Sequence, residues 1–232
     1  MKNSSFFLML LLTIVGGGRV FGQNHVDFNS LYRKTLQGDM IMVGNSILNE
    51  GNTRPANTPY VGSHGWNSSI NLEYADVDGD PSTFNSSSAF VSHPASACLK
   101  VDKAYLYWSV AYTQERVNNQ VNPKFERNKF NSVKFKTPNS AYQTFTGTPI
   151  YDGNHQLALK PNSEDSQRAY VYRADVTNML LTEGTARNGS FSGDYTVANI
   201  MAPYGTEWSG VGYAAGWTLV IIYEDKKTRQ VR

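Results

Sequence analysis

An acidic stretch at residues 76–90, DVDGDPSTFNSSSAF, places three aspartates at alternate positions ahead of small hydroxyl and amide residues. Carboxylates at this spacing can converge on one hard cation, and oxygens from Thr83 and Asn85 can complete its coordination. Ca²⁺ is favoured over Mg²⁺ because such a loop offers many oxygens at flexible geometry. The sequence therefore predicts a calcium site formed by Asp76, Asp78, Asp80, Thr83 and Asn85.

Two other interpretations of this stretch stay open. The stretch is not an EF-hand, because counting from Asp76 the sixth position is Pro81 instead of glycine and the twelfth is Ser87 instead of glutamate. Asp, Asn and Ser also favour turns, since their side chains bond to nearby backbone amides, so a polar turn network is the second interpretation. The third is a pair of catalytic carboxylates. No Lys or Arg lies between Glu73 and His93, and uncompensated like charges favour a bound cation.

A second group of candidates is aromatic. Four aromatic residues lie in segments rich in Gly, Pro and Ser, which is typical of loops: Tyr60, Trp66, Tyr204 and Trp208. Loop aromatics at one end of a β-sandwich can stack on the apolar face of a sugar ring, and these residues are predicted as ligand-binding on that basis. The alternative is that they fill the ends of the core.

Other reactive residues give no recognisable site. The four histidines, His25, His64, His93 and His155, lack the spacing of zinc ligands, and no G-x-S-x-G element is present. Cys98 is the only cysteine, so no disulfide can form within the chain. Because it precedes an alternating apolar segment, we expect its thiol to be buried and inert.

The N-terminus is typical of a signal peptide at residues 1–22. Lys2 supplies a positive charge, residues 6–15 form an apolar run too short to span a bilayer, and small residues stand at Val20 and Gly22. We therefore expect an exported, extracellular or cell-surface protein.

Removal of that peptide changes the charge balance. The chain has 21 Lys and Arg and 19 Asp and Glu, and loss of Lys2 and Arg19 leaves 19 of each. The mature protein is then neutral and has no basic cluster interleaved with aromatic residues. This excludes nucleic acid as the expected partner.

The hydrophobic pattern predicts an all-β protein. Residues 103–112, KAYLYWSVAY, carry apolar side chains on both faces, which suits a central strand covered on both sides. A helix is expected only at 175–182, with Asp175 as its N-cap. Strands are expected at 39–48, 103–112, 132–136, 142–146, 169–174, 195–201 and 216–224. The expected fold is an antiparallel β-sandwich, jelly-roll-like, with one short helix and long polar loops at 49–72 and 113–130.

The last residues predict an interrupted hairpin. The strand at 216–224 is followed by the turn-like Asp225-Lys226-Lys227 and a short return segment, 228–232, whose backbone would stay unpaired. We therefore expect an extension at 23–36 and a sandwich domain at 37–232 that is truncated at its C-terminal edge and belongs to a longer polypeptide.

Several segments together resemble a known group of proteins. They are GDMIMVGNSIL, EYADVDGDPSTFNSSSA, AYLYWSVAY, VKFKTP, ADVT, GDYTVANI and GWTLVIIYED. In this order they resemble the N-terminal region of very large Bacteroidota cell-surface adhesins of the gliding-motility group, which are exported by Sec and the type IX secretion system. The resemblance covers most of 37–232, and its most specific part is the acidic stretch. The C-terminal sorting domain of type IX substrates is absent from this sequence.

The resemblance implies a non-enzymatic adhesin module. Its expected partners are a surface polysaccharide or solid substratum, the type IX export machinery, and the rest of a longer polypeptide. The alternatives are a structural module that caps a filament or stalk, and a glycan-active enzyme that uses carboxylates of the acidic stretch. Binding to a glycan array would separate adhesion from capping, and release of reducing sugar would support the enzyme.

Overall fold

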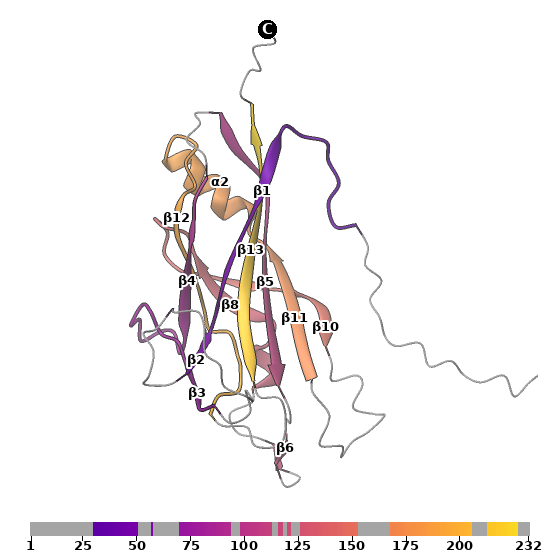
Figure 1. Ribbon diagram of the computed structural model, residues 1–232, viewed down its shortest axis with the longest axis vertical. Coiled ribbons are helices and arrows are strands. Elements are labelled where there is room, and N and C mark those ends of the chain that lie inside the picture. Colours follow the sequence, from indigo (N-terminus) through magenta and orange to yellow (C-terminus); the bar gives the residue numbers. More distant parts are fainter. Residues whose placement is uncertain are drawn as a thin grey trace, which may run out of the picture.

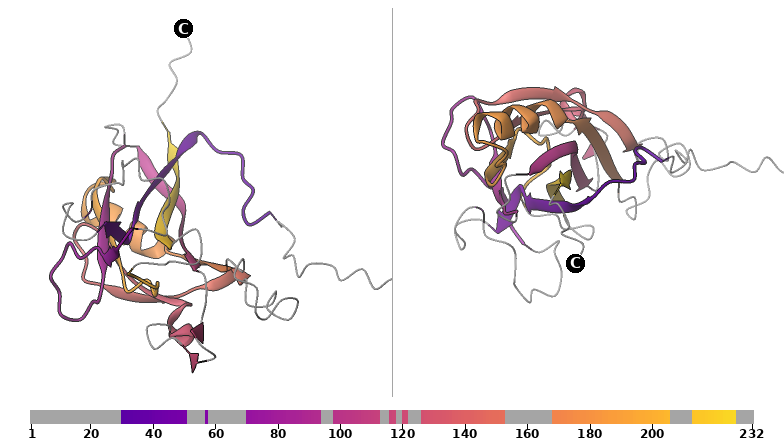
Figure 2. Two further views of the ribbon diagram at one scale, coloured as in Figure 1. Left: turned by 60° about the horizontal axis from the view of Figure 1, so that its bottom comes forward. Right: turned by 90° about the horizontal axis from the view of Figure 1, so that it is seen from above.

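The part of the chain that the structure describes forms an antiparallel β-sandwich with one short α-helix, as predicted (Figure 1). The computed structural model describes residues 30–50, 57, 70–93, 98–112, 116–117, 120–121, 126–152, 168–205 and 213–226. The predicted signal peptide lies outside these residues. Figure 2, seen from above, shows the strands curving around a common interior with helix α2 at its rim.

Two main sheets form the sandwich. The five-stranded sheet has the order β1 (Gly38–Ser46), β13 (Ala214–Asp225), β5 (Leu99–Tyr112), β11 (Arg168–Asp175) and β10 (Thr148–Asp152). The four-stranded sheet has the order β4 (Ser86–Val91), β12 (Gly193–Ala198), β8 (Ser132–Lys136) and β9 (Gln143–Thr146). Two small pairs join β2 (Leu48–Glu50) to β3 (Leu72–Tyr74) and β6 (Arg116–Val117) to β7 (Gln120–Val121).

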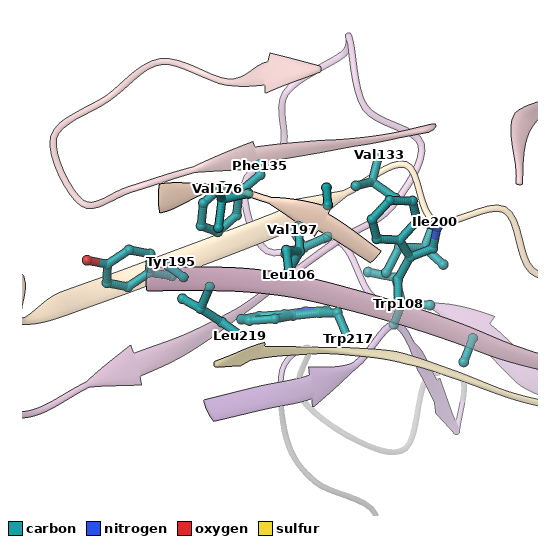
Figure 3. Close-up of a cluster of buried hydrophobic side chains, with 14 of the residues drawn as sticks. Leu106, Trp108, Val133, Phe135, Val176, Tyr195, Val197, Ile200, Trp217 and Leu219 are labelled. Carbon is teal, nitrogen blue, oxygen red and sulfur yellow. The ribbon is translucent and has the colours of Figure 1, made fainter. Parts of the chain in front are cut away.

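The core lies between the two main sheets. Alternate residues of β5 and β13 point inward, and both tryptophans of these strands, Trp108 and Trp217, are almost completely buried. Figure 3 shows them packed with apolar side chains from β8, β12 and the segment before α2. The indole of Trp108 donates to the carbonyl of Phe130 at 2.8 Å, and that of Trp217 donates to Ser87 Oγ at 2.8 Å. Both buried indoles therefore have the polar partner that burial requires.

Strand β4 was missed by the sequence prediction. Its residues Ser86, Ser87 and Ser88 are typical of turns by composition. In the structure Ser86 and Ser87 are fully buried, and Ser88 Oγ lies 2.9 Å from Thr196 Oγ1 on the paired strand. Hydroxyl partners supplied by distant strands thus stabilise a strand that local propensity disfavours.

Helix α2 spans Thr177–Ala186, so it begins two residues later and ends four residues later than predicted. Its N-cap is Val176, so the predicted N-cap at Asp175 is wrong; Asp175 instead accepts a hydrogen bond from the Thr177 amide at 2.9 Å. The helix is anchored on β5, because the Val176 amide donates to the carbonyl of Ala104 at 3.0 Å. Within the described part of the chain, no helix is long and apolar enough to cross a membrane.

At one end of the five-stranded sheet, the segment that precedes β1 contacts the long strands β5 and β13. In the β1–β13 register Gly38 lies opposite Glu224, so β1 begins where β13 ends (Figure 1). Lys34 forms ion pairs there with Asp102 and with Glu224, the latter at 2.7 Å. At the same end Cys98 is exposed, so its predicted burial is wrong. The strand β5 that follows it starts only at Leu99.

Candidate functional site

The acidic stretch forms a compact turn between β3 and β4. Its ends are held by backbone hydrogen bonds from Ala75 to Ile47 at 2.9 Å and from Ser86 to Ala75 at 2.8 Å. Ser86 Oγ donates to Asp76 Oδ1 at 3.0 Å. Gly79 has a φ of +58°, which permits the chain to reverse within the turn.

The other two carboxylates accept hydrogen bonds from the turn itself. Asp78 Oδ1 accepts from the Asp80 amide at 3.0 Å and from Thr83 Oγ1 at 3.1 Å. Asp80 Oδ1 accepts from the Ser82 amide at 2.8 Å. These contacts are the side-chain-to-backbone bonds that define polar turns.

Residues from β8 and from the segment before β9 complete this acidic turn. The hydroxyl of Tyr142 donates to Asp78 Oδ2. Lys134 Nζ, on β8, donates to the carbonyl and hydroxyl of Ser82 at 2.9 and 2.8 Å. Lys136 lies 4.6 Å from the centre of the Tyr142 ring. The acidic turn has no Lys or Arg in its own segment, and β8 supplies the positive charge. Sequence reasoning missed these partners because no local spacing signals them.

The protonation states support this network. Desolvation opposes ionisation of Asp78, but hydrogen bonds from Tyr142, the Asp80 amide and Thr83 outweigh it and lower the pKa of Asp78. Hydrogen bonds from Ser82, with the charge of Lys134, lower the pKa of Asp80. Burial and the bond to Asp78 raise the pKa of Tyr142. At neutral pH the carboxylates are therefore charged and the phenol keeps the proton it donates.

Asn85 faces a different part of the molecule from the one predicted. Its side chain is fully buried, with Nδ2 donating to the carbonyl of Ile200 at 2.8 Å and Oδ1 accepting from the Ile200 amide at 3.1 Å. Thr83 acts as a donor to Asp78. Over the described ranges, no three His, Cys, Asp or Glu side chains are grouped so that they could hold a metal ion. The contacts favour the turn network, and the calcium site stays a prediction.

Chelation decides between these two interpretations. We expect EDTA to leave the melting temperature unchanged, because donors within the protein already bond to the Asp78 and Asp80 carboxylates. Tyr142→Phe should lower stability by about 1.5 kcal/mol through loss of one hydrogen bond to a charged group. Differential scanning calorimetry with EDTA, Ca²⁺ and Mg²⁺ measures both effects. A melting temperature that falls in EDTA and recovers only with Ca²⁺ would establish the calcium site instead.

Beside the acidic turn lies a row of three aromatic rings, Phe84, Tyr74 and Tyr204, here called the aromatic row. The Tyr74 ring centre is 5.6 Å from that of Phe84 and 4.8 Å from that of Tyr204. The outer members are 37% and 38% exposed, for Phe84 and Tyr204 respectively, while Tyr74 is half-buried between them. Phe84 and Tyr204 therefore present their rings to solvent, and both rings pack against Tyr74.

Hydrogen bonds fix the backbone around this row. The Phe84 amide donates to Asn199 Oδ1 at 2.9 Å, and Asn199 itself has a left-handed φ of 62°. The Tyr74 hydroxyl donates to the carbonyl of Ala202, and burial raises the pKa of Tyr74 to about 12. The acidic turn ends directly at Phe84, so its network also sets the position of this ring.

Comparison of the chain with protein-family models, curated proteins and solved structures found no significant match. Any role for the acidic turn and the aromatic row is therefore inferred from their geometry alone. The acidic turn is a hydrogen-bonded unit whose donors and acceptors largely serve one another. The aromatic row is the surface that this unit supports and that a ligand can reach.

One predicted ligand residue belongs to the row. Tyr204 lies there, whereas Tyr60, Trp66 and Trp208 lie outside the described residues. Sequence reasoning missed Phe84, although an isolated aromatic residue within a polar stretch was a visible signal. It also missed Tyr74, which precedes the acidic turn and gave no separate signal.

Proposed function

We propose that this chain is a non-enzymatic module of an exported surface adhesin and that it binds polysaccharide at the aromatic row. The observation that carries the proposal is the pair of exposed rings, Phe84 and Tyr204, held on either side of Tyr74. An aromatic face packs well against the apolar face of a pyranose ring. Rings that are already fixed lose little conformational entropy on binding, which favours affinity.

Export and surface display are supported by the sequence. Residues 1–22 have the pattern of a signal peptide, and the segments that resemble gliding-motility adhesins form β1, the acidic turn, β5, β8 and β13. The most specific of these segments is the acidic turn, which ends at Phe84. The most specific segment of the resemblance thus leads directly into the aromatic row.

The alternative of a glycan-active enzyme has less support. A carboxylic acid that protonates a leaving group works best with a raised pKa, close to the working pH. In the acidic turn the pKa values of Asp78 and Asp80 are lowered, and their oxygens accept bonds from Tyr142, Thr83 and backbone amides. This environment stabilises permanent carboxylates, which suits a structural role.

Substitution of the exposed rings tests the proposal. Phe84→Ala and Tyr204→Ala should each weaken polysaccharide binding about tenfold, equivalent to about 1.4 kcal/mol, because one stacking surface is lost. Binding is measured on a glycan array and then by titration calorimetry. Phe90→Ala is the matched control, since Phe90 is 61% exposed on β4. Equal affinities in all variants, or no binding by the wild type, would contradict the proposal.

A further inference from the structure

A trough runs over the outer face of the five-stranded sheet. Two adjoining cavities of about 490 and 450 Å³ share four lining residues, so they form one continuous hollow. The shared residues are Ser46, Ser109, Val171 and Gly216. Ser109 is exposed at the centre of this face, so β5 is not covered on both sides as the sequence predicted.

Small residues in register create the hollow. Gly216 lies opposite Ser46 on one side and Ser109 on the other, and Ser109 lies opposite Val171. A Cβ on Gly216 would lie 2.7 Å from the carbonyl oxygen of Asn45, so a larger residue there would disturb the packing of β1 on β13. The hollow is therefore built into the pairing of these strands.

The described residues that line the 450 Å³ cavity are all uncharged. It offers the phenol ring of Tyr107 and the hydroxyls of Ser109 and Thr218. Among the described residues that line the 490 Å³ cavity, one is charged, Glu50. Hydroxyls beside an aromatic ring suit an uncharged sugar, whereas an acidic polymer would meet no positive charge among the described residues that line the two cavities.

The trough and the aromatic row meet at β3. Leu72 of this strand lines the 490 Å³ cavity, and Tyr74, two residues later, belongs to the row. Leu72 also pairs with Gly205, the residue after Tyr204. Strand β3 therefore contributes one residue to each feature, and the two features are neighbours along this strand.

We propose that the trough is a second subsite for the same ligand, namely an internal stretch of an uncharged polysaccharide. One part of the chain stacks on the aromatic row, and further sugar units occupy the trough over β13, β5 and β11. This inference rests on the proposed function. It adds that the ligand is neutral, that its chain end is not required, and that affinity grows with chain length until the trough is filled.

Filling the trough tests the inference. Ser109→Tyr places a ring in the hollow at an exposed strand position, where an aromatic residue suits β structure. Its matched control is Thr144→Tyr, at an exposed position on β9 of the other sheet. The probes are mannan, laminarin, dextran and hydroxyethyl cellulose, with alginate as the acidic comparison, together with di- and trisaccharides of each neutral polymer. Melting temperatures confirm that both variants fold.

The outcomes separate the two proposals. We expect Ser109→Tyr to bind the neutral polymer about tenfold more weakly than the wild type, with unchanged affinity for the short fragments and no effect of Thr144→Tyr. If Ser109→Tyr binds the polymer like the wild type while Tyr204→Ala binds weakly, the trough inference fails and the proposed function stands. Preferential binding of alginate also overturns the inference. If none of the polymers binds the wild type, both proposals fail.

Discussion

Replacing Gly147 by alanine should lower the free energy of unfolding by about 2–3 kcal/mol, the upper range for overpacking a core. Gly147 alone separates β9 from β10, so the chain crosses from one sheet to the other at this residue. A Cβ there would lie 2.3 Å from Cη2 of Trp108 and 3.1 Å from Cβ of Tyr172. The Trp108 ring cannot retreat, because it is 1% exposed and bonded to Phe130.

The matched control is a glycine-to-alanine substitution that should raise the free energy of unfolding. Gly184 lies inside α2, and a Cβ there would meet its nearest atom, the carbonyl oxygen of Gly189, at 3.9 Å, an ordinary contact distance. Gly184→Ala should therefore raise stability by about 0.5–1 kcal/mol through helix propensity. Urea unfolding followed by tryptophan fluorescence measures both variants. A Gly147→Ala protein as stable as the wild type would show that the structure around Gly147 can accommodate a Cβ atom and would contradict the prediction.

A second large effect is expected at Glu183, whose side chain is only 3% exposed. Its carboxylate accepts hydrogen bonds from Thr137 Oγ1 at 2.7 Å, from Asn139 Nδ2 at 2.6 Å and from Arg187 Nη1 at 3.1 Å. It thereby joins α2 to the turn between β8 and β9. Glu183→Gln should lower the free energy of unfolding by about 2–3 kcal/mol, because buried donors lose a charged acceptor.

The effect should depend on pH in a defined direction. Desolvation opposes ionisation of Glu183, but the hydrogen bonds from Thr137, Asn139 and Arg187 outweigh it and lower its pKa below the ordinary 4.5. A depressed folded-state pKa contributes stability above the unfolded pKa and loses it as the pH falls through the folded pKa. The difference between wild type and Glu183→Gln should therefore be full at neutral pH and shrink below 4.5.

An exposed glutamate serves as the comparison. Glu126 pairs with Lys129 at 2.7 Å, but both side chains are nearly half exposed. Glu126→Gln should change stability by about 0.5 kcal/mol or less at any pH. Urea titrations of the three proteins across the acid range measure these differences. A Glu183→Gln deficit that persists unchanged in acid would assign the loss to packing instead of charge.

The fold was predictable where hydrophobic alternation is strong. The strand at 132–136 has the predicted bounds, and β5 and β13 were found because their inward residues alternate with outward ones. Strand β10 was missed because Pro149 interrupts it at a bulge. Helix α2 passes through Gly184, beyond the predicted end at residue 182, because its packing on β5 outweighs the weak helix propensity of glycine.

The candidate site was predictable only in part, because its contacts cross long sequence separations. The acidic turn was identified from spacing, but its partners Lys134 and Tyr142 come from β8 and from the segment before β9, and they leave no local pattern. Asn85 shows the same limit, since its amide is bound by Ile200 and not by the turn. Composition can therefore locate a polar turn, but the residues that bond to it are known only once the order of the strands is known.

The register of β1 against β13 also has a mechanical consequence. Because Gly38 lies opposite Glu224, a pull applied through these two residues loads the strand pair from one end, and its hydrogen bonds break one after another. Force applied along the strands in opposite directions would instead load the whole ladder at once. The ion pairs of Lys34 stand at the end that opens first. A pull through residues 38 and 224 should therefore extend the domain at low force. Single-molecule pulling that needs more force through residues 38 and 224 than through residues 38 and 217 would contradict this.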